Sequence, residues 1–364
     1  MSTEQRKHPQ DSPAAISVKS EHYGQLDDGR EVQLFTIENG QGVTAQVTNY
    51  GAILTALIMP DREGERRDVV HGFDDLAGWL GNEPYFGATV GRFGNRIAAG
   101  RFSLDGKDYS LATNNEPAGV PCALHGGLRG FSHVLWTAKI IAGGVQLSYH
   151  SPDGEEGYPG ALEVTVSYLL NEQNELTWKA EATTTQATPI NIINHSYWNL
   201  SGDPTTSVAD HLLTIASDHI LEAGADMIPT GALLPVAETP MDFRKAHTIG
   251  ARIEADYSPL QQANGYDHSW VLPCDGLTLA AKACDPISGR CLKILTDQPA
   301  LQFYTANFLD GHLAGKSGVR YQARSAFCLE TEGYPDAPNN PKAPNCILRP
   351  GERYQHTMVH QLSW

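Results

Sequence analysis

Apolar residues recur at every second position in several segments of the chain, and this pattern limits the possible folds more than any other feature of the sequence. The clearest series are Val43, Ala45 and Val47; Leu162, Val164, Val166 and Tyr168; and Leu176, Trp178, Ala180 and Ala182. Because successive side chains of a β-strand point to opposite faces, such a series predicts a strand with one buried face. Strands are therefore expected to dominate the fold.

Turn residues between these segments predict antiparallel hairpins. Asp105-Gly106 suits a tight type I′ turn and has apolar residues on both sides, so residues 101–111 are expected to form a hairpin. Asn171-Glu172-Gln173-Asn174 marks a second hairpin. Helical periodicity is weak and confined to residues 74–80 and 249–255. We predict an all-β fold, a large antiparallel β-sandwich with a few short helices.

The first residues of the chain are polar. They lack the apolar core of roughly 7–15 residues that a signal peptide needs, and no later segment reaches the ~18 uninterrupted apolar residues of a membrane span. We expect residues 1–16 to form a disordered tail and residues 17–364 to form a single domain. We also expect a cytoplasmic protein that is a monomer or a homodimer.

The six cysteines are scattered, and none forms the Cys-x-x-Cys pair found in zinc and redox sites. We interpret most of them as reduced packing thiols, as expected in the cytoplasm. A disulfide between Cys284 and Cys291 is the alternative if the protein is exported.

The charge balance limits the possible partners. The chain has 42 acidic and 26 basic residues, which give a formal net charge of −16. This charge repels phosphate backbones and anionic lipid surfaces. We expect neither a nucleic-acid partner nor a membrane partner, and a neutral substrate rather than a phosphorylated one.

Several polar residues stand inside otherwise apolar strands and glycine-rich turns. The candidate site residues are Asn95, Arg96, His125, His195, Asp267, Gln302 and Glu330. Taken singly, each has an ordinary explanation. Glu330 points away from the face shared by Phe327 and Leu329, and such a side chain usually faces water. His195 is equally acceptable as a hydrogen-bonded core histidine.

In combination, these side chains suit a neutral sugar. Polar groups bind hydroxyls, and flat rings such as Trp198, Tyr304 or Trp79 can cover the apolar face of a pyranose. Opening a cyclic hemiacetal needs a base for the C1 hydroxyl proton and an acid for the ring oxygen. A glutamate and a histidine can supply both near neutral pH.

The polar segments also follow one another in a recognisable order. They are Gly91-Arg92-Phe93-Gly94-Asn95-Arg96-Ile97, Leu124-His125-Gly126-Gly127, Ser151-Pro152-Asp153-Gly154-Glu155-Glu156-Gly157-Tyr158-Pro159-Gly160, Asn194-His195-Ser196-Tyr197-Trp198-Asn199-Leu200, Met241-Asp242-Phe243-Arg244, Gly265-Tyr266-Asp267-His268, and Glu330 with Pro335-Asp336-Ala337-Pro338-Asn339. In number and order they resemble the motifs of the aldose 1-epimerase, or galactose mutarotase, family. The resemblance extends from about Val18 to the C-terminus.

This resemblance implies a function and a role for each candidate residue. The function is interconversion of the α and β anomers of free hexoses such as glucose and galactose, without a metal or an organic cofactor. Glu330 would be the base at the C1 hydroxyl, His195 the acid at the ring oxygen, and His125 an assisting residue. The substrate-binding residues would be Asn95, Arg96, Asp267 and Gln302. The implied fold is a many-stranded β-sandwich with the sugar in an open groove.

The sequence departs from the family pattern beside the implied site. Residues 115–123 lengthen the approach to Leu124-His125-Gly126-Gly127, and Thr331-Glu332-Gly333-Tyr334 stands where P-Q-x-x is more usual. Two alternatives stay open. An enzyme acting on hexose 6-phosphates would need a basic cluster for the phosphate. A non-catalytic carbohydrate-binding protein of the same fold would not need both Glu330 and His195.

Overall fold

The computed structural model describes residues 16–273 and 275–364. The tail predicted for residues 1–16 thus lies, apart from Ile16, outside the described residues. Ile16 packs against the largest core cluster. It directly precedes the first strand.

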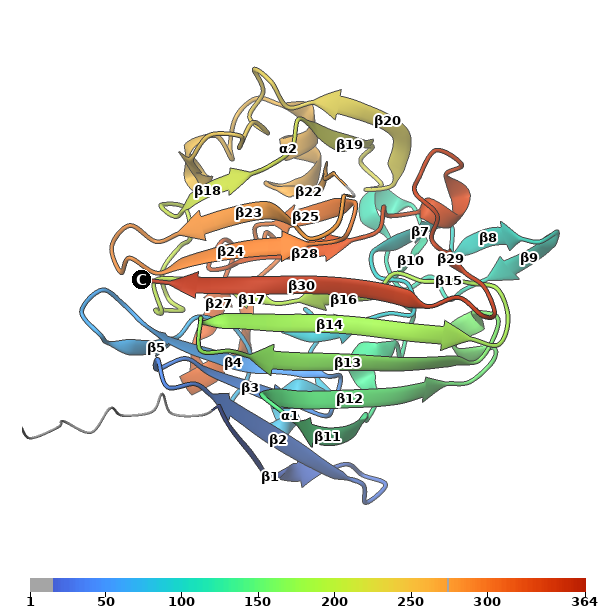
Figure 1. Cartoon of the computed structure of the whole chain (residues 1–364). Helices are drawn as coiled ribbons and strands as arrows, with labels where there is room; N and C mark the ends of the chain where they lie inside the picture. Colours follow the sequence, from blue (N-terminus) through green and yellow to red (C-terminus); the bar gives the residue numbers. More distant parts are fainter. Residues whose placement is uncertain (1–15, 274) are drawn as a thin grey trace, which may run out of the picture.

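One broad sheet forms the front layer of the molecule in Figure 1. Over the described residues its nine strands are, in spatial order, β11 (Thr137–Ile141), β12 (Gly144–Ser151), β13 (Leu162–Leu170), β14 (Glu175–Thr184), β30 (Tyr354–Ser363), β24 (Cys291–Thr296), β23 (Thr278–Cys284), β18 (Leu212–Ile215) and β21 (His247–Thr248). All neighbouring strands in this sheet are antiparallel.

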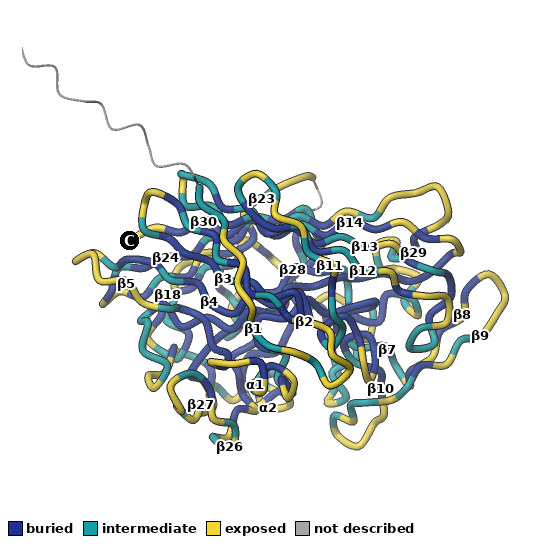
Figure 2. The backbone as a smooth tube through the Cα atoms, turned by 90° about the horizontal axis from the view of Figure 1, so that it is seen from below, coloured by how far each residue is buried: buried dark blue, intermediate teal, exposed yellow. Residues whose placement is uncertain are grey.

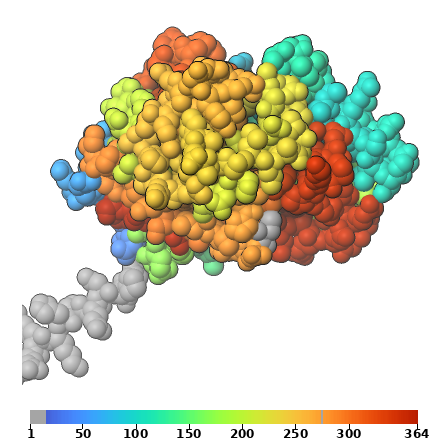
Figure 3. Space-filling view, turned by 90° about the horizontal axis from the view of Figure 1, so that it is seen from above, coloured from blue at the N-terminus to red at the C-terminus, as the bar shows by residue number. Residues whose placement is uncertain are grey.

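Two further antiparallel sheets pack behind the first. The five-stranded sheet contains β1 (Ser17–Gln25), β2 (Glu31–Glu38), β3 (Thr44–Thr48), β4 (Ile53–Pro60) and β5 (Arg66–Asp68). The six-stranded sheet contains, in spatial order, β17 (Tyr197–Trp198), β28 (Phe327–Glu332), β25 (Ala300–Tyr304), β22 (Asp267–Val271), β19 (His219–Ala223) and β20 (Pro229–Pro235). In Figure 3, the view from above, the yellow segment that contains β19 and β20 forms much of the visible surface.

Short strand pairs and helical turns connect the three sheets. The pairs are β6 (Ala88–Val90) with β16 (Ile193–His195), β7 (Arg96–Ala98) with β10 (Cys122–Leu124), β8 (Arg101–Leu104) with β9 (Lys107–Ser110), β15 (Thr188–Pro189) with β29 (Ile347–Leu348), and β26 (Asp310–Ala314) with β27 (Arg320–Gln322). The α-helices are α1 (Leu76–Leu80) and α2 (Ser258–Ala263), and the 3₁₀ turns are Pro117–Gly119, Phe131–His133, Glu155–Gly157, Ile249–Ala251, Lys316–Gly318 and Ala337–Asn339.

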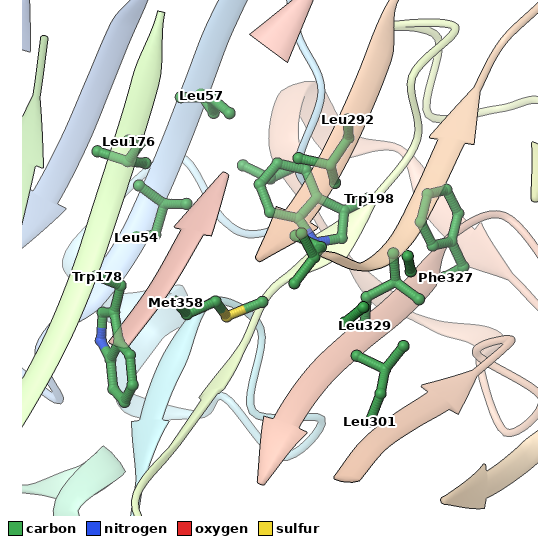
Figure 4. Close-up of a cluster of buried hydrophobic side chains, with 14 of the residues drawn as sticks. Leu54, Leu57, Leu176, Trp178, Trp198, Leu292, Leu301, Phe327, Leu329 and Met358 are labelled. Atoms are coloured by element: carbon green, nitrogen blue, oxygen red, sulfur yellow. The ribbon is translucent and has the colours of Figure 1, made fainter. Parts of the chain in front are cut away.

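The core lies between the three sheets. Its largest cluster joins Leu54 of the five-stranded sheet, Trp178 and Met358 of the nine-stranded sheet, and Leu301 and Leu329 of the six-stranded sheet (Figure 4). The chain is buried along most strands and exposed mainly at the connecting loops (Figure 2). Because one cluster of side chains joins all three sheets, we infer that the described residues form a single domain.

The period-two series predicted the strands correctly. They lie on β13, on β14 and at β3, which Val43 directly precedes, and the apolar side chains are buried. In the hairpin of β8 and β9, Leu104 pairs with Lys107. Asp105 and Gly106 have φ values of 50° and 76°, as a type I′ turn requires. The all-β sandwich prediction is confirmed.

Of the two helical predictions, one is confirmed and one is wrong. Helix α1 lies within residues 74–80, and the Asp75 side chain caps it by accepting from the Gly78 amide at 3.1 Å. Residues 249–255 form only a short 3₁₀ turn, and the helix follows at Ser258–Ala263. Pro259 stands in its first turn and Asn264 ends it in a left-handed conformation, so the local start and stop residues decided its place.

For one pair of cysteines the structure has the alternative that the sequence left open. Cys284 and Cys291 form a disulfide. They are paired residues of β23 and β24, so the strand register brings the two sulfurs together. Cys122, Cys328 and Cys346 carry free thiols, and Cys274 lies outside the described residues. In the described part of the chain, neither helix has the length and apolar character needed to cross a membrane.

Candidate active site

A pocket of about 550 Å³ brings together all the candidate site residues. Its lining includes Asn95, Arg96, His125, His195, Asp267, Gln302 and Glu330. These residues are spread over most of the sequence, and the three sheets and their connections bring them to one place. The structure therefore brings all seven residues together in one pocket.

Neighbouring strands of the six-stranded sheet form the floor of the pocket. Gln302 on β25 pairs with Glu330 on β28 on one side and with Ser269 on β22 on the other. Asp267 begins β22 two residues before Ser269, so its side chain lies on the same face. The second face of β28 is therefore the floor of a pocket, which is why Glu330 is buried rather than exposed to water.

The short pair of β7 and β10 supplies the opposite wall. Leu124 pairs with Arg96, which places Asn95 and His125 side by side. Both residues have left-handed φ values, 64° and 52°, a conformation in which asparagine and histidine are enriched. The Asn95 backbone amide donates to His125 Nδ1 at 3.1 Å. His125 therefore carries its proton on Nε2, the nitrogen away from this hydrogen bond.

The glycine-rich motif at residues 151–160 does not line this pocket but supports it. Arg92 is buried, and its Nη1 donates to the carbonyls of Pro159 at 2.9 Å and Gly160 at 2.7 Å. Glu156 accepts from the backbone amides of Leu128 and Arg129, at 2.9 Å and 3.0 Å. The motif thus anchors the turns that carry Asn95 and His125.

The carboxylate and imidazole implied as a proton-transfer pair lie next to each other. His195 Nε2 is 3.5 Å from Glu330 Oε2, and the two side chains are 6% and 3% exposed. The ring of Tyr197 stacks on His195 with centroids 5.2 Å apart, and His125 lies edge-on at 5.1 Å. Packing from both sides therefore fixes the imidazole in front of the carboxylate.

Burial shifts the two pKa values of this pair in opposite directions. It raises the pKa of Glu330 well above its ordinary value, and the charges of Glu332 and Asp267 act in the same direction. Burial lowers the pKa of His195 to about 4. Both shifts favour the neutral pair, with the shared proton on Glu330 and His195 uncharged, so this proton must pass to His195 before Glu330 can act as a base.

The potential metal-binding atoms at this place do not suit a shared ion. Among the described residues, His195, Cys328 and Glu330 bring such atoms within 4.8 Å of one another. However, His195 Nδ1 faces the Cys328 sulfur at 3.8 Å, whereas Nε2 faces Glu330. The two lone-pair directions of an imidazole diverge, so one ion cannot use both contacts. The arrangement suits proton transfer instead.

The predicted binding residues present polar groups to the pocket. Gln302 Nε2 donates to Asp267 Oδ1 at 2.6 Å. Arg96 Nε donates to Asn115 Oδ1 at 3.3 Å. Asn115 belongs to the segment that lengthens the approach to His125, and part of that segment lines the pocket. The extra residues therefore shape one wall of the groove.

Two of the three aromatic residues expected to cover the sugar do not line the pocket. Trp79 and Trp198 are fully buried, and Figure 4 shows Trp198 among the core side chains. Tyr304 does line the pocket, together with Tyr85 and Phe308. Phe308 is 65% exposed. An aromatic residue in a loop has no periodic signal, so only its exposure beside the pocket identifies it.

Glu332 is a further acidic residue beside the site, and it is not among the candidates chosen from the sequence. This residue is fully buried and lies on the same face of β28 as Glu330, two residues away. Asn95 Nδ2 donates to it at 3.2 Å, and Ser269 Oγ lies 2.9 Å from its Oε1. Its two-residue spacing from Glu330 was the signal in the sequence.

These features define a class of protein. A buried acid/base pair in a groove, surrounded by amides, one guanidinium and aromatic rings, is typical of an enzyme that moves protons on a neutral, hydroxyl-bearing substrate.

Comparison with known proteins narrows this class to one family. The profile of the family described as aldose 1-epimerase matches residues 33–361. Galactose mutarotase of Rattus norvegicus is 45% identical over 350 residues, 96% of this chain and 99% of that protein. Aldose 1-epimerase of Escherichia coli (strain K12) is 34% identical over 341 residues, 92% of this chain and 96% of that protein. The structure of galactose 1-epimerase from Lactobacillus acidophilus NCFM covers 96% of this chain and 99% of its own, with a TM-score of 0.83 and 25% identity.

The chain belongs to the aldose 1-epimerase family. It is an enzyme that interconverts the anomers of free aldoses, and the two alternatives open from the sequence are not favoured.

Proposed function

We propose that Glu330 and His195 open and reclose the sugar ring. The Glu330 carboxylate removes the proton of the C1 hydroxyl, the C1–O5 bond breaks as the C1 carbonyl forms, and protonated His195 gives its proton to O5. Rotation about the C1–C2 bond turns the other face of the carbonyl toward O5. The same steps in reverse close the ring, so both groups regain their starting protonation states.

The observation that carries this proposal is the pair itself. Two groups of opposite proton-transfer role lie 3.5 Å apart, are nearly inaccessible to bulk water and line a pocket of sugar size. Burial raises the pKa of the Cys328 thiol, so Cys328 keeps its proton and can donate weakly to His195 Nδ1. The exchangeable proton is then held on Nε2, which faces Glu330.

We propose that the surrounding polar residues bind the sugar. Asn95, Arg96, Asp267 and Gln302 hold hydroxyls, and His125 assists with a donor on Nε2. Arg96 is the only lysine or arginine among the described residues that line the pocket. A hexose phosphate would call for a cluster of such groups, so a free hexose such as galactose or glucose fits better.

One chain supplies every residue of this site, so catalysis does not depend on assembly. We therefore keep the proposal of a monomer or a homodimer. Light scattering coupled to size exclusion is expected to give a mass near 39.5 kDa or twice that value. A larger assembly as the main species would contradict it.

Polarimetry tests the proposed function. Freshly dissolved α-D-galactose or α-D-glucose is expected to reach its equilibrium rotation faster with the protein than without it. No metal or nucleotide needs to be added, because the described chemistry uses protein groups alone. Activity that is lost with EDTA and restored by a metal ion would contradict this mechanism.

Replacing Asp267 with Asn is expected to raise KM by about tenfold or more, the effect of losing a charged hydrogen-bond acceptor, while kcat changes little. The proton-transfer pair stays intact, and an asparagine Oδ1 can still accept from Gln302 Nε2. Steady-state polarimetry measures both constants. The matched control is Asp218→Asn, at a side chain that is 71% exposed. A variant with unchanged KM and abolished turnover would move Asp267 into the proton-transfer chemistry.

A further inference from the structure

Four polar side chains form a continuous chain beneath the pocket. Ser269 Oγ lies 2.9 Å from Glu332 Oε1 and 2.5 Å from Gln302 Oε1. At its other end, Gln302 Nε2 lies 2.6 Å from Asp267 Oδ1. The chain therefore runs from Glu332 through Ser269 and Gln302 to Asp267, and it contains three contacts of hydrogen-bonding length.

The number of protons in this chain decides its charge. A serine hydroxyl has one proton, and a glutamine amide can donate only from its nitrogen. If both carboxyls are ionised, Ser269 can donate to Glu332 or to Gln302, but not to both. One of the three contacts then joins two oxygens without a proton, whichever way the Gln302 amide is turned. Three hydrogen bonds require one additional proton, on Glu332 or on Asp267.

The surroundings favour Glu332 as the proton carrier. Asp267 is 8% exposed and lines the pocket, whereas Glu332 is fully buried and does not line it. Charged groups act on Glu332 from three elements: Glu330 on its own strand, Asp267 on β22 and Arg96 on β7. Burial above all, and then the neighbouring carboxyl groups, disfavour a further negative charge on Glu332.

The fixed orientation of Asn95 is consistent with this assignment. Its Oδ1 accepts from the Arg96 backbone amide at 2.9 Å, so its Nδ2 is the group that faces Glu332. Asn95 donates to the carboxyl from one side, and the carboxyl hydroxyl is free to donate to Ser269 on the other. Every member of the chain is then satisfied.

We propose that Glu332 carries a proton at neutral pH and, through Ser269, holds the Gln302 amide with its nitrogen toward Asp267. Glu332 is a positioning residue for sugar binding, and this inference rests on the proposed function, in which Gln302 and Asp267 bind hydroxyls. A neutral carboxyl donates to Ser269 as a glutamine amide would, but only while it keeps its proton.

Loss of that proton has a direct consequence for the binding residues. Burial raises the pKa of Glu332 to about 8, so the carboxyl is neutral below that pH and ionised above it. Once Glu332 is ionised, Ser269 donates to it, and Gln302 Oε1 loses its donor. If the Gln302 amide keeps its orientation, its Oε1 remains unpaired. If the amide turns over, its oxygen faces Asp267, which then loses its hydrogen-bond donor. Sugar binding is expected to weaken as the pH rises through about 8.

The kinetic test compares pH profiles of KM and kcat by polarimetry with α-D-galactose. In the wild type, KM is expected to rise by about tenfold above pH 8, the effect of one lost hydrogen bond to a charged group, while kcat changes less. In Glu332→Gln this rise is expected to disappear, because the new amide donates to Ser269 at every pH. Ser269→Ala breaks the chain and is expected to have the high KM at neutral pH as well.

Asp336→Asn is the matched control. Asp336 is another buried carboxyl with a raised pKa, caused chiefly by burial, but it lies outside the chain and accepts from the Ala98 amide. This variant is expected to keep the wild-type rise in KM. Circular dichroism checks the fold of each variant. The proposal would be overturned if the wild-type KM did not rise above pH 8, or if the KM of a folded Glu332→Gln protein still rose.

Infrared difference spectroscopy gives a readout that does not depend on catalysis. The wild-type spectrum minus the Glu332→Gln spectrum is expected to contain a protonated carboxyl band at pH 7 that vanishes as the pH passes about 8. Absence of this band at pH 7 would overturn the proposal. If the proposed function were wrong, no variant would speed anomer equilibration, yet the band would still decide whether Glu332 is protonated.

Discussion

Glu330→Gln is expected to lower kcat by roughly 10²–10⁴-fold, the usual contribution of a general acid or base. Glutamine has nearly the same shape as glutamate but cannot take up the C1 hydroxyl proton. Glu330 is 3% exposed, and its neighbour across the strands is the neutral Gln302, so a neutral amide fits without leaving a buried charge. Folding and sugar binding should therefore largely persist.

Polarimetric kcat and KM, with circular dichroism as the check on folding, measure this effect. Glu254→Gln is the matched control, since that side chain is 78% exposed and pairs with Arg324. It should leave kcat unchanged. A folded Glu330→Gln protein that turns over near the wild-type rate would remove Glu330 from the proton-transfer step.

His195→Asn is expected to lower kcat by a similar factor, roughly 10²–10⁴-fold. Asparagine can still form a hydrogen bond at this position but cannot give a proton to O5 and take it back. The rings of Tyr197 and Tyr85 stack on His195 at 5.2 Å and 6.1 Å, so the smaller side chain also loses packing. Some loss of stability should accompany the loss of turnover.

The control for this variant is His219→Asn, an exposed histidine on β19. The double variant of Glu330 and His195 should lose less than the product of the single losses, because one proton transfer has little effect once the other is gone. Losses that multiply in full would mean that the two residues act in separate steps.

The pH dependence of kcat should belong to the pair rather than to either residue. Burial raises the pKa of Glu330 and lowers that of His195 to about 4, so one proton is shared between them over the working range. The rate should fall when the pair gains a second proton at low pH and when it loses its only proton at high pH. Each single variant should lose the bell shape, and a bell-shaped profile retained in both would contradict the assignment.

Local sequence determined the strands and the hairpins. The series on β13 and β14 needs only neighbouring residues to be recognised, because the alternation of side chains is a property of the strand itself. The Asp105-Gly106 turn is equally local, since its two residues must adopt positive φ. The polar residues of the site could also be chosen in advance, because polar side chains inside apolar strands stand out and their motifs follow the order of a known family.

Tertiary structure decided which neighbours those residues have. Trp198 looked like a sugar-covering ring and is a core side chain, whereas Phe308 carries no pattern and lies exposed beside the pocket. The disulfide of Cys284 and Cys291 depends on strand register. Glu332 acquires its contacts from Asn95 and Ser269, which lie 237 and 63 positions earlier in the sequence. Burial, register and the number of available protons arise from packing between distant segments, and a one-dimensional pattern does not contain them.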